Sequence, residues 1–460
     1  MKVTYQYRFY PNTNQKLTLN QWLRIGRYWY NRQLGDRFDW WEMNRTTINA
    51  CPLKTSIAAP REKPNYYHQK QQLPILKKDL VKVVHSSELL DFKQVDSTVM
   101  QDVSKRVDQA FERFIVGDSK GGKSGRPRFK TERDYRTMTF STASNDWIKL
   151  IRKNWIYLRL PKLGVVKVRR HRAIPNGFTI KQVSVTRKAD GWFIQLMLED
   201  TYVPEVTTDQ IIPTWDNSIG LDAVLHEDVY LATSEGEKLP SLKPLRNNQA
   251  KLDRISTKRN KRRRGSKSRR KLAKKESRQH QKIARSRKDF HYKTAHKLVR
   301  SGAQLFFHED LNLKGLTKRN QVKQNEDGKY LPNRQSAKSG LNKSWQDAAF
   351  GQFFTTLDYI AVKAGAVVIS QKPAYTSMVL SYRNEIIFTD CSIRDYWDEQ
   401  NSLIVDRDIN AAINLKRLGL GIFPSIKRRG GNLSVVGSMD DSTTKEILHT
   451  LHRAAKKPTS

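Results

Sequence analysis

Hydrophobic and polar positions follow two different periods in the first 200 residues. Residues 2–10 alternate apolar and polar side chains, which is typical of a half-buried strand. Residues 13–35 and 95–116 carry apolar side chains at helical spacing, whereas residues 60–75 are rich in Pro, Tyr and Gln and predict a loop. Residues 136–200 contain several short strand patterns. We therefore expect a small antiparallel barrel with a helical lobe inserted after an edge strand.

The second half alternates short apolar runs with helical patterns, as in an α/β domain. Its predicted strands are residues 218–224, 229–233, 303–308 and 366–370. One helix is predicted from Trp345 to Ala364 and another from Asp406 onward. Between the strands, residues 317–343 have few apolar side chains and predict a flexible loop. The polar tail from Gly419 contains a weak helical pattern near Lys445 to Lys457 and is expected to be mobile.

Positive charge is concentrated in residues 251–300, which contain 22 Lys and Arg against three acids. Gly265 and Ser266 divide this stretch into two predicted helices. A solvated helix normally mixes charges of both signs, so we interpret the stretch as a helical hairpin that faces phosphates. The candidate contacts are Arg262, Arg263, Arg264, Lys267, Arg269 and Arg270.

The composition narrows the class of protein. The 460 residues carry a formal net charge of +40, which indicates a polyanionic partner, with nucleic acid as the default. Two cysteines, Cys51 and Cys391, are too few for a disulfide framework and favour a reducing, cytoplasmic setting. No run approaches about 20 apolar residues, so we expect neither secretion nor a membrane partner. A chain of this length is expected to hold two or three domains.

Residues 117–124 match the phosphate-binding pattern G-x-x-x-x-G-K-[ST]. Such a loop normally follows a buried strand and opens a helix whose N-terminus faces the phosphates. Here it follows an amphipathic helix and runs into Gly125-Arg126-Pro127. We therefore interpret it as a basic linker. Its continuation supplies three further candidate nucleic-acid contacts, Arg126, Arg128 and Lys130.

Four carboxylates stand out by position. Asp222 lies in a predicted strand, Glu309 ends another, and Asp406 and Asp408 open an apolar helix. Individually each has an ordinary explanation, because acids cap helix N-termini and pair with lysines. Together, in this order, they suit Mg²⁺ or Mn²⁺, since hard cations take oxygen ligands and two metal ions can stabilise both the attacking and the leaving oxygens in phosphodiester hydrolysis.

The residues around these acids resemble the three split RuvC motifs of the transposon-encoded TnpB proteins and their compact type V CRISPR relatives. The matching stretches are Gly220-Leu221-Asp222, His308 to Leu316, and Asp406 to Ala412. The resemblance implies a prokaryotic, nucleoid-associated, RNA-guided DNA endonuclease whose partners are a guide RNA and double-stranded target DNA. Its catalytic, Mg²⁺-binding acids would be Asp222, Glu309 and Asp408, with Asp406 as an auxiliary residue.

The resemblance also implies a domain plan. A β-barrel wedge domain would comprise residues 1–10 and 126–205, with a helical recognition domain at 11–125. Residues 206–460 would form the RNase H-like (RuvC) nuclease domain. Within it we expect the basic hairpin at 247–301, a target-loading insert at 372–405 and a flexible tail at 420–460. The expected fold class is therefore α/β and multidomain.

The chain departs from the family in the insert. Many TnpB proteins carry two C-x-x-C pairs there, but this sequence has Leu380, Arg383, Asp398 and Asn401 near those places. Because a closed zinc site needs four ligands, we expect no zinc. The insert is predicted to pack instead through Tyr382, Ile386, Ile387, Phe388, Tyr396 and Trp397.

Three alternatives remain at this stage. A protein of the same build could bind DNA under RNA guidance without cutting it, although all three acids are present. A transposase could also use an acidic triad, but we find no His-hydrophobic-His motif with a tyrosine nucleophile. A plain RNA-binding protein would leave the ordered carboxylates without a role.

Overall fold

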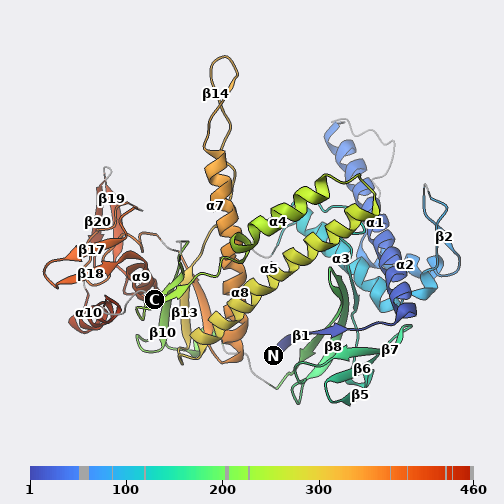
Figure 1. Cartoon of the computed structure of the whole chain (residues 1–460), viewed down its shortest axis with the longest axis horizontal. Helices are drawn as coiled ribbons and strands as arrows, with labels where there is room; N and C mark the ends of the chain where they lie inside the picture. The colour runs from blue at the N-terminus through green and yellow to red at the C-terminus, as the bar shows by residue number, and fades with distance from the viewer. Residues whose placement is uncertain are drawn as a thin grey trace. The chain divides into compact units, whose positions relative to one another are not determined.

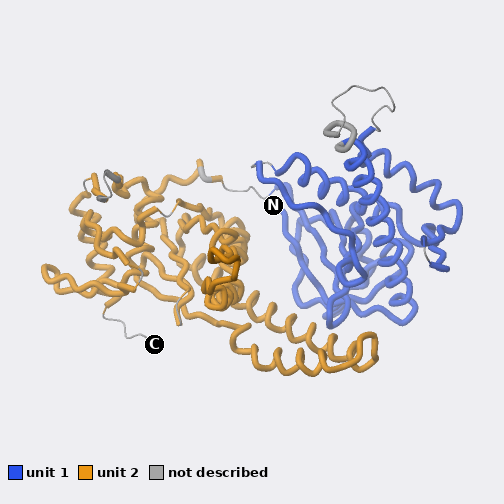
Figure 2. Tube along the Cα trace, turned by 90° about the horizontal axis from the view of Figure 1, so that it is seen from above, with its two compact units in different colours: residues 1–204 blue, residues 205–460 orange. Residues whose placement is uncertain are grey.

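The chain forms two compact units in the computed structural model, residues 1–204 and 205–460, which Figure 2 colours separately. The residues that the structure describes are 1–50, 62–84, 86–118, 121–202, 207–225, 228–372, 374–390, 392–429, 432–437 and 439–455. Cys51 and Cys391 lie outside these ranges. None of the helices in the described ranges is both long and apolar enough to cross a bilayer.

Unit 1 contains a seven-stranded antiparallel sheet in the order β4-β8-β9-β1-β7-β6-β5. Its strands are β1 (Lys2–Phe9), β4 (Thr137–Phe140), β5 (Ile148–Arg152), β6 (Trp155–Leu160), β7 (Gly164–Arg169), β8 (Thr179–Lys188) and β9 (Gly191–Glu199). The edge position predicted for the first strand is wrong, because β1 pairs with both β9 and β7. Alternation reports which faces of a strand are buried and not how many neighbours it has. Closure of this sheet into a barrel stays a prediction.

In the described part of unit 1, three α-helices and a small hairpin accompany the sheet (Figure 1): α1 (Thr13–Ala50), α2 (Tyr66–Leu76), α3 (Ser97–Ile115), β2 (Val81–Lys82) and β3 (Leu89–Leu90). The loop predicted for residues 60–75 is wrong over most of its length, because α2 begins at Tyr66. Asn65 caps α2 by accepting a hydrogen bond from the His68 N–H at 3.0 Å. Gln69 is buried, and its side-chain oxygen accepts a hydrogen bond from Arg37 Nε at 2.9 Å. Hydrogen bonds to distant residues thus hold α2 in the fold, whereas its polar composition predicted no helix here.

Unit 2 contains a five-stranded sheet in the order β12-β11-β10-β13-β16. The strands are β10 (Ser218–Ala223), β11 (Val229–Thr233), β12 (Lys238–Pro240), β13 (Leu305–Glu309) and β16 (Val367–Gln371). The first three form an antiparallel meander, and β13 and β16 then join β10 in parallel. The four strands predicted in this half are therefore confirmed. The carboxyl ends of β10, β13 and β16 lie at one edge of the sheet.

The helix predicted from Trp345 to Ala364 is broken in the structure. It forms the end of α7 (Gln335–Ala348) and the whole of α8 (Phe350–Lys363), separated by Ala349 in the left-handed conformation at φ 50°. Part of the loop predicted at 317–343 is also wrong, because α7 begins at Gln335. The short elements before it are α6 (Leu313–Leu316), β14 (Lys323–Gln324) and β15 (Tyr330–Leu331). Figure 1 shows the β14–β15 hairpin at the far end of α7.

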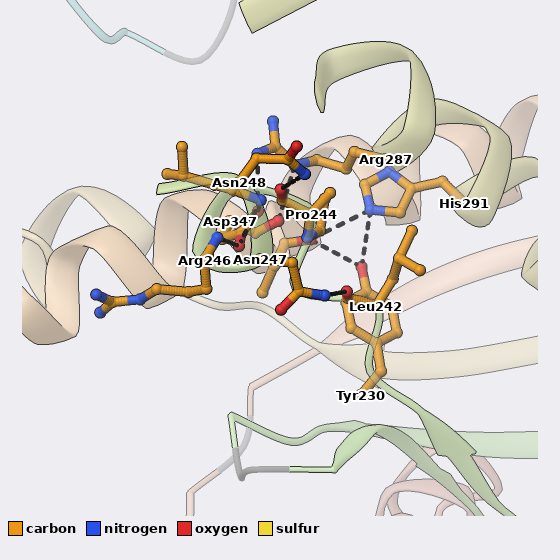
Figure 3. A network of polar contacts seen from close by, with 11 residues as sticks. Tyr230, Leu242, Pro244, Arg246, Asn247, Asn248, Arg287, His291 and Asp347 are labelled. Atoms are coloured by element: carbon orange, nitrogen blue, oxygen red, sulfur yellow. Dashed lines mark hydrogen bonds and ion pairs between the residues drawn. The ribbon is translucent and has the colours of Figure 1, made fainter. Parts of the chain in front are cut away.

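The predicted basic hairpin is confirmed as α4 (Pro244–Asn260) and α5 (Lys267–Val299), which project from the body of unit 2 (Figures 1 and 2). Ser266 caps α5 by accepting the Arg269 N–H at 3.2 Å. A polar network fixes the base of the hairpin (Figure 3). There the buried Asp347 accepts the N–H groups of Leu245 and Arg246 at 2.9 Å, and Arg287 pairs with it at 3.0 Å.

The C-terminal part consists of β17 (Asp395–Asp398), β18 (Leu403–Asp406), α9 (Arg407–Gly419), β19 (Ser425–Arg429), β20 (Asn432–Val436) and α10 (Asp441–Ala455). The helix predicted near Lys445 to Lys457 is confirmed as α10, although it begins earlier. The mobility predicted for it is wrong, because α10 buries Ile447 and Leu451 in a hydrophobic cluster that includes residues of α9. Two apolar residues four positions apart face one side of a helix, but the pattern does not show what they pack against.

Candidate active site

Two parallel strands deliver the first two acids to the same level of the sheet. The register pairs Gly220 with Phe307 and Leu221 with His308. Asp222 and Glu309 each follow the last of these pairs by one position. Asp222 is 8% exposed, and Glu309 is partly buried. The strand pairing therefore places two acids side by side although they are 87 positions apart in the sequence.

Helix α9 carries the third acid, Asp408. Two glycines, Gly220 of β10 and Gly419 of α9, let this helix pack closely against the sheet. A Cβ on Gly220 would lie 1.9 Å from the carbonyl oxygen of Ala412. At the other end of the helix, a Cβ on Gly419 would lie 2.3 Å from the ring of Phe307. Any larger residue would force α9 away from β10 and β13. The packing of this helix directs its first turn, which contains Asp408, toward the end of β10.

The acids interact electrostatically. Burial raises the pKa of Asp222 well above its usual range, and the negative charges of Glu309, Asp408 and Asp406 raise it further. Burial also raises the pKa of Glu309, from an ordinary value of 4.5 to about 7. Neither the Asp222 nor the Glu309 carboxyl has a hydrogen bond or ion pair with any residue in the described ranges. Both are thus carboxylates that lack the compensation a buried charge requires.

Asp406 and Asp408 are held differently. Asp406 caps α9, because one of its oxygens accepts the N–H groups of Asp408 and Ile409 at 3.0 Å each. Lys238 of β12 forms an ion pair with Asp406 and lies 3.5 Å from an Asp408 oxygen. Arg394 approaches the other Asp408 oxygen at 3.2 Å. Sequence reasoning missed these two cationic neighbours of the acids, because nothing in the local sequence marks a cation that meets an acid 14 or 170 positions away.

The donor set suits a hard divalent cation, since every candidate ligand is a carboxylate oxygen. Among the residues that the structure describes, no three His, Cys, Asp or Glu side chains are grouped closely enough to hold a metal ion as they stand. The ion pairs of Asp408 with Lys238 and Arg394 direct it toward these cations. Among the described residues, Asp222 and Glu309 nevertheless have no hydrogen-bond or ion-pair partner, so the cluster retains unsatisfied oxygen donors.

Other neighbours orient the acids. His308 stacks on Phe354 with ring centroids 3.8 Å apart, and its Nδ1 lies 2.7 Å from the backbone oxygen of Glu309. Asn410 and Asn414 of α9 are fully buried and reach the segment before β17. Asn410 accepts the Ser381 N–H at 2.7 Å, and Asn414 donates to the Thr376 carbonyl at 2.9 Å. The asparagines of this motif therefore tie the insert to the helix that carries Asp408.

Three of the four positions that replace the family's cysteines meet in the insert. Asp398, which is 1% exposed, pairs with Arg383 at 3.3 Å and accepts the Asn401 amide at 2.7 Å. Tyr382 donates its hydroxyl to the same carboxylate at 2.5 Å. The fourth position, Leu380, is fully buried.

Most of the predicted aromatic and aliphatic packing of the insert is observed. Tyr382 and Phe388 are buried, while Ile386, Ile387 and Tyr396 are partly buried. The prediction for Trp397 is wrong, because its side chain is 56% exposed. Adjacent residues of a strand point to opposite faces. Because Asp398 and its ion pair lie on the buried face of β17, the neighbouring Trp397 points to solvent.

The candidate nucleic-acid residues divide into free and engaged side chains. Those that lie exposed at the tip of the hairpin are Arg262, Arg263, Arg264, Lys267 and Arg270. Arg269 instead donates to the backbone carbonyls of Arg259 and Arg262 at 3.1 and 3.0 Å, which closes the turn. In unit 1, Arg126 pairs with Glu42 at 2.6 Å, Arg128 is exposed and Lys130 is partly buried. The segment at 117–124 follows α3 and is not followed by a helix before β4, as the linker interpretation expects.

Three family profiles match separate parts of the chain. Residues 202–320 match the OrfB family of IS605 elements, described as "Probable transposase". Residues 1–46 match the "Helix-turn-helix domain" of the same family, although the structure has there a strand and a single long helix. Residues 350–415 match "Cas12f1-like, TNB domain".

Individual relatives extend the similarity. The chain is 25% identical over 427 residues to a protein of Streptomyces pristinaespiralis named "Putative RNA-guided DNA endonuclease", covering 91% of this chain and 90% of the relative. It is 26% identical over 341 residues to "Putative RNA-guided DNA endonuclease InsQ" of Escherichia coli K12, covering 74% and 78%. A solved Cas12f1-sgRNA-target DNA complex is 13% identical, with a TM-score of 0.29, over 91% of this chain and all of the other.

Fold and site together define a mixed α/β protein with an acidic cluster where two parallel strands and one helix N-terminus meet. The family profiles and the relatives point in the same direction. The chain is similar to the TnpB (OrfB) family in three separate segments and, at 25–26% identity, over most of its length.

Proposed function

We propose that this chain is an RNA-guided DNA endonuclease that uses a guide RNA to select complementary double-stranded DNA and hydrolyses its phosphodiester backbone. The observation that carries the proposal is the convergence of Asp222, Glu309 and Asp408 at one end of the sheet. The names of the family relatives support the same activity. The order of unit 2, a meander followed by parallel strands and α9, supports an RNase H-like (RuvC) core.

Asp222, Glu309 and Asp408 would hold Mg²⁺ or Mn²⁺, which would polarise the scissile phosphate and activate water. The residues of the chain provide the rest of the site. His308 orients Glu309, and the Asp406 cap fixes the first turn of α9 on which Asp408 lies. Lys238 and Arg394 neutralise the acids that Asp222 and Glu309 repel. In this proposal Asp406 is a structural cap rather than a ligand.

The exposed tip of the basic hairpin would contact phosphates of the guide RNA. Its cations lie beyond the clamp at Asp347, so they can engage a backbone without disturbing the sheet. Contacts of this kind position a nucleic acid and do not read its sequence. The wedge and recognition domains would contribute the remaining grip on RNA and DNA.

Cleavage of a guide-matched duplex by purified complex tests the proposal. Asp222→Ala, Glu309→Ala and Asp408→Ala should each reduce cleavage at least about 10³-fold while leaving RNA affinity near wild type, because the ligands hold the metal and not the nucleic acid. Asp310→Ala, next to Glu309, is the matched control and should retain activity. Wild-type chain that binds RNA and target DNA without cutting either strand would support an RNA-guided binding protein instead.

A further inference from the structure

A basic cavity of about 460 Å³ lies in unit 1, between α1, the β2–β3 hairpin and the segment that carries Lys130. We call it the α1 cavity. Helix α1 contributes Arg24, Arg27, Tyr28 and Arg32 to its lining. These positions are three, four and eight residues apart, so they share one face of the helix. The opposite face carries buried core residues such as Trp22 and Trp29.

The charges of the α1 cavity are unbalanced. Its lining contains four cations, the three arginines of α1 and Lys130, but a single acid, Glu88. Glu88 is already paired, because it lies 2.6 Å from Arg24. The remaining cations therefore face the cavity with no carboxylate in its lining left for them. Tyr28 adds an aromatic ring of the kind on which nucleobases stack.

Arg27 distinguishes this surface from an ordinary solvated helix face. It is partly buried, yet neither Arg27 nor Arg32 forms a hydrogen bond or an ion pair with any described residue. Elsewhere in unit 1, several arginines have carboxylate partners within 4.0 Å: Arg8, Arg37, Arg106, Arg126 and Arg187. A guanidinium held in a concavity without a counter-ion is suited to an external anion, and phosphate matches its fork of donors.

Lys130 is held in place at the cavity by a specific contact. The Asn31 amide donates to the Lys130 carbonyl at 2.9 Å and accepts the Lys130 N–H at 2.7 Å. This two-way bond fastens an otherwise irregular segment to α1. The cavity therefore combines cations from two separate parts of the chain in a fixed arrangement.

We propose that the α1 cavity binds a backbone phosphate of the nucleic-acid partner, with Arg27 and Arg32 as its direct ligands. This inference deepens the proposed function. It rests on that function in one respect, which is that the bound anion is taken to be part of a polynucleotide. A phosphodiester of the RNA and one of the DNA share the same chemistry. The experiment therefore measures the two separately.

Arg27→Gln/Arg32→Gln is made in the Asp222→Ala chain, and two affinities are measured across a salt series. The first is for the RNA that co-purifies with the chain, and the second is the affinity of the RNA-loaded chain for a duplex matching that RNA. One affinity should fall about tenfold for each lost contact, and its log–log salt slope should flatten by up to about 0.9 per contact for duplex or 0.7 for single strands. A fall in the first affinity assigns the phosphate to RNA, and a fall in the second alone assigns it to DNA.

Arg152→Gln/Arg159→Gln is the matched control, because it removes two exposed arginines from β5 and β6 of the same unit. Equal losses in both double variants, or no loss in either affinity, would overturn the inference. Arg32→Gln alone, at an exposed position, serves if the double variant does not fold and should show about half of the slope change. Cleavage is scored separately in chains with intact acids. If the chain cleaves DNA but Arg27→Gln/Arg32→Gln changes neither affinity, only this inference is refuted. If the double variant weakens one affinity but the chain never cleaves DNA, only the proposed activity is refuted.

Discussion

Two groups of buried carboxylates in unit 2 have opposite surroundings. Asp347 and Asp398 are 3% and 1% exposed, and each is surrounded by donors, as Figure 3 shows for Asp347. Asp222 is 8% exposed and lies beside Glu309, but neither carboxyl has a donor among the described residues. All four are acids within one unit. The difference lies in whether the fold supplies the compensating charge.

The pKa directions follow this difference. Burial by itself raises the pKa of Asp398, but hydrogen bonds from Tyr382, Asn401 and Gln400, together with the charge of Arg383, outweigh it and leave the pKa lowered. At Asp222, burial and the neighbouring acids act in the same direction and raise the pKa. Removing a satisfied buried acid destabilises the fold because its partners are left uncompensated, whereas an unsatisfied buried acid itself destabilises the fold until a cation binds. This difference favours a structural role for the first group and supports the site proposed for the second.

The largest effect on stability is expected at Asp347. Asp347→Ala should lower the free energy of unfolding by about 3–5 kcal/mol, because it leaves Arg287 unpaired and uncaps α4. Chemical denaturation of the RNA-free protein measures this loss. Asp253→Ala, at an exposed acid of the same helix, should change stability by no more than about 0.5 kcal/mol. Equal, small effects at both positions would show that the Asp347 network does not hold the hairpin.

Divalent metal should stabilise the folded chain through the second group, Asp222 and Glu309, and not through Asp347 or Asp398. At about 100 times its dissociation constant, Mg²⁺ should add about 2.7 kcal/mol to the stability of the RNA-free chain. Asp222→Asn should remove this gain, whereas a variant at Asp398 should retain it. Thermal unfolding with and without the metal measures the effect. Equal metal-induced shifts in wild type and Asp222→Asn would place the metal elsewhere.

The pH dependence of the metal-free protein sharpens the same comparison. The pKa of Glu309 is raised from 4.5 to about 7, so the folded state binds its proton more tightly than the unfolded state does. The stability that this proton contributes is present below about pH 4.5 and is lost as the pH rises through about 7. Glu309→Gln should therefore unfold less readily than wild type near neutral pH, with the two converging in acid. Unfolding curves that stay parallel over this range would contradict the unsatisfied state of Glu309.

The sequence predicted the strands of unit 2 because their apolar runs are short and bounded. It singled out the candidate acids because ordered motifs surround them. It did not predict α2, whose polar residues such as Gln69 are buried by partners far along the chain. Nor did it predict the break at Ala349, since an alanine in the left-handed conformation runs against its helical preference. Lys238 and Arg394 were missed for the same reason as α2. Periodicity describes a face of an element, whereas these features depend on contacts made by the folded chain.

The smallest expected effect concerns zinc. In the insert, Arg383, Asp398 and Asn401 form an ion-pair and hydrogen-bond cluster at positions where the TnpB resemblance leads us to expect cysteines. Because donors of the protein already satisfy Asp398, we expect purified chain to carry no stoichiometric zinc and a strong chelator to leave its thermal unfolding unchanged. Asp398→Asn, which removes the charge but keeps the shape, should instead lower the unfolding temperature, since Arg383 loses its buried partner. Elemental analysis that finds one zinc per chain, or a chelator effect as large as that of Asp398→Asn, would show that the insert depends on metal after all.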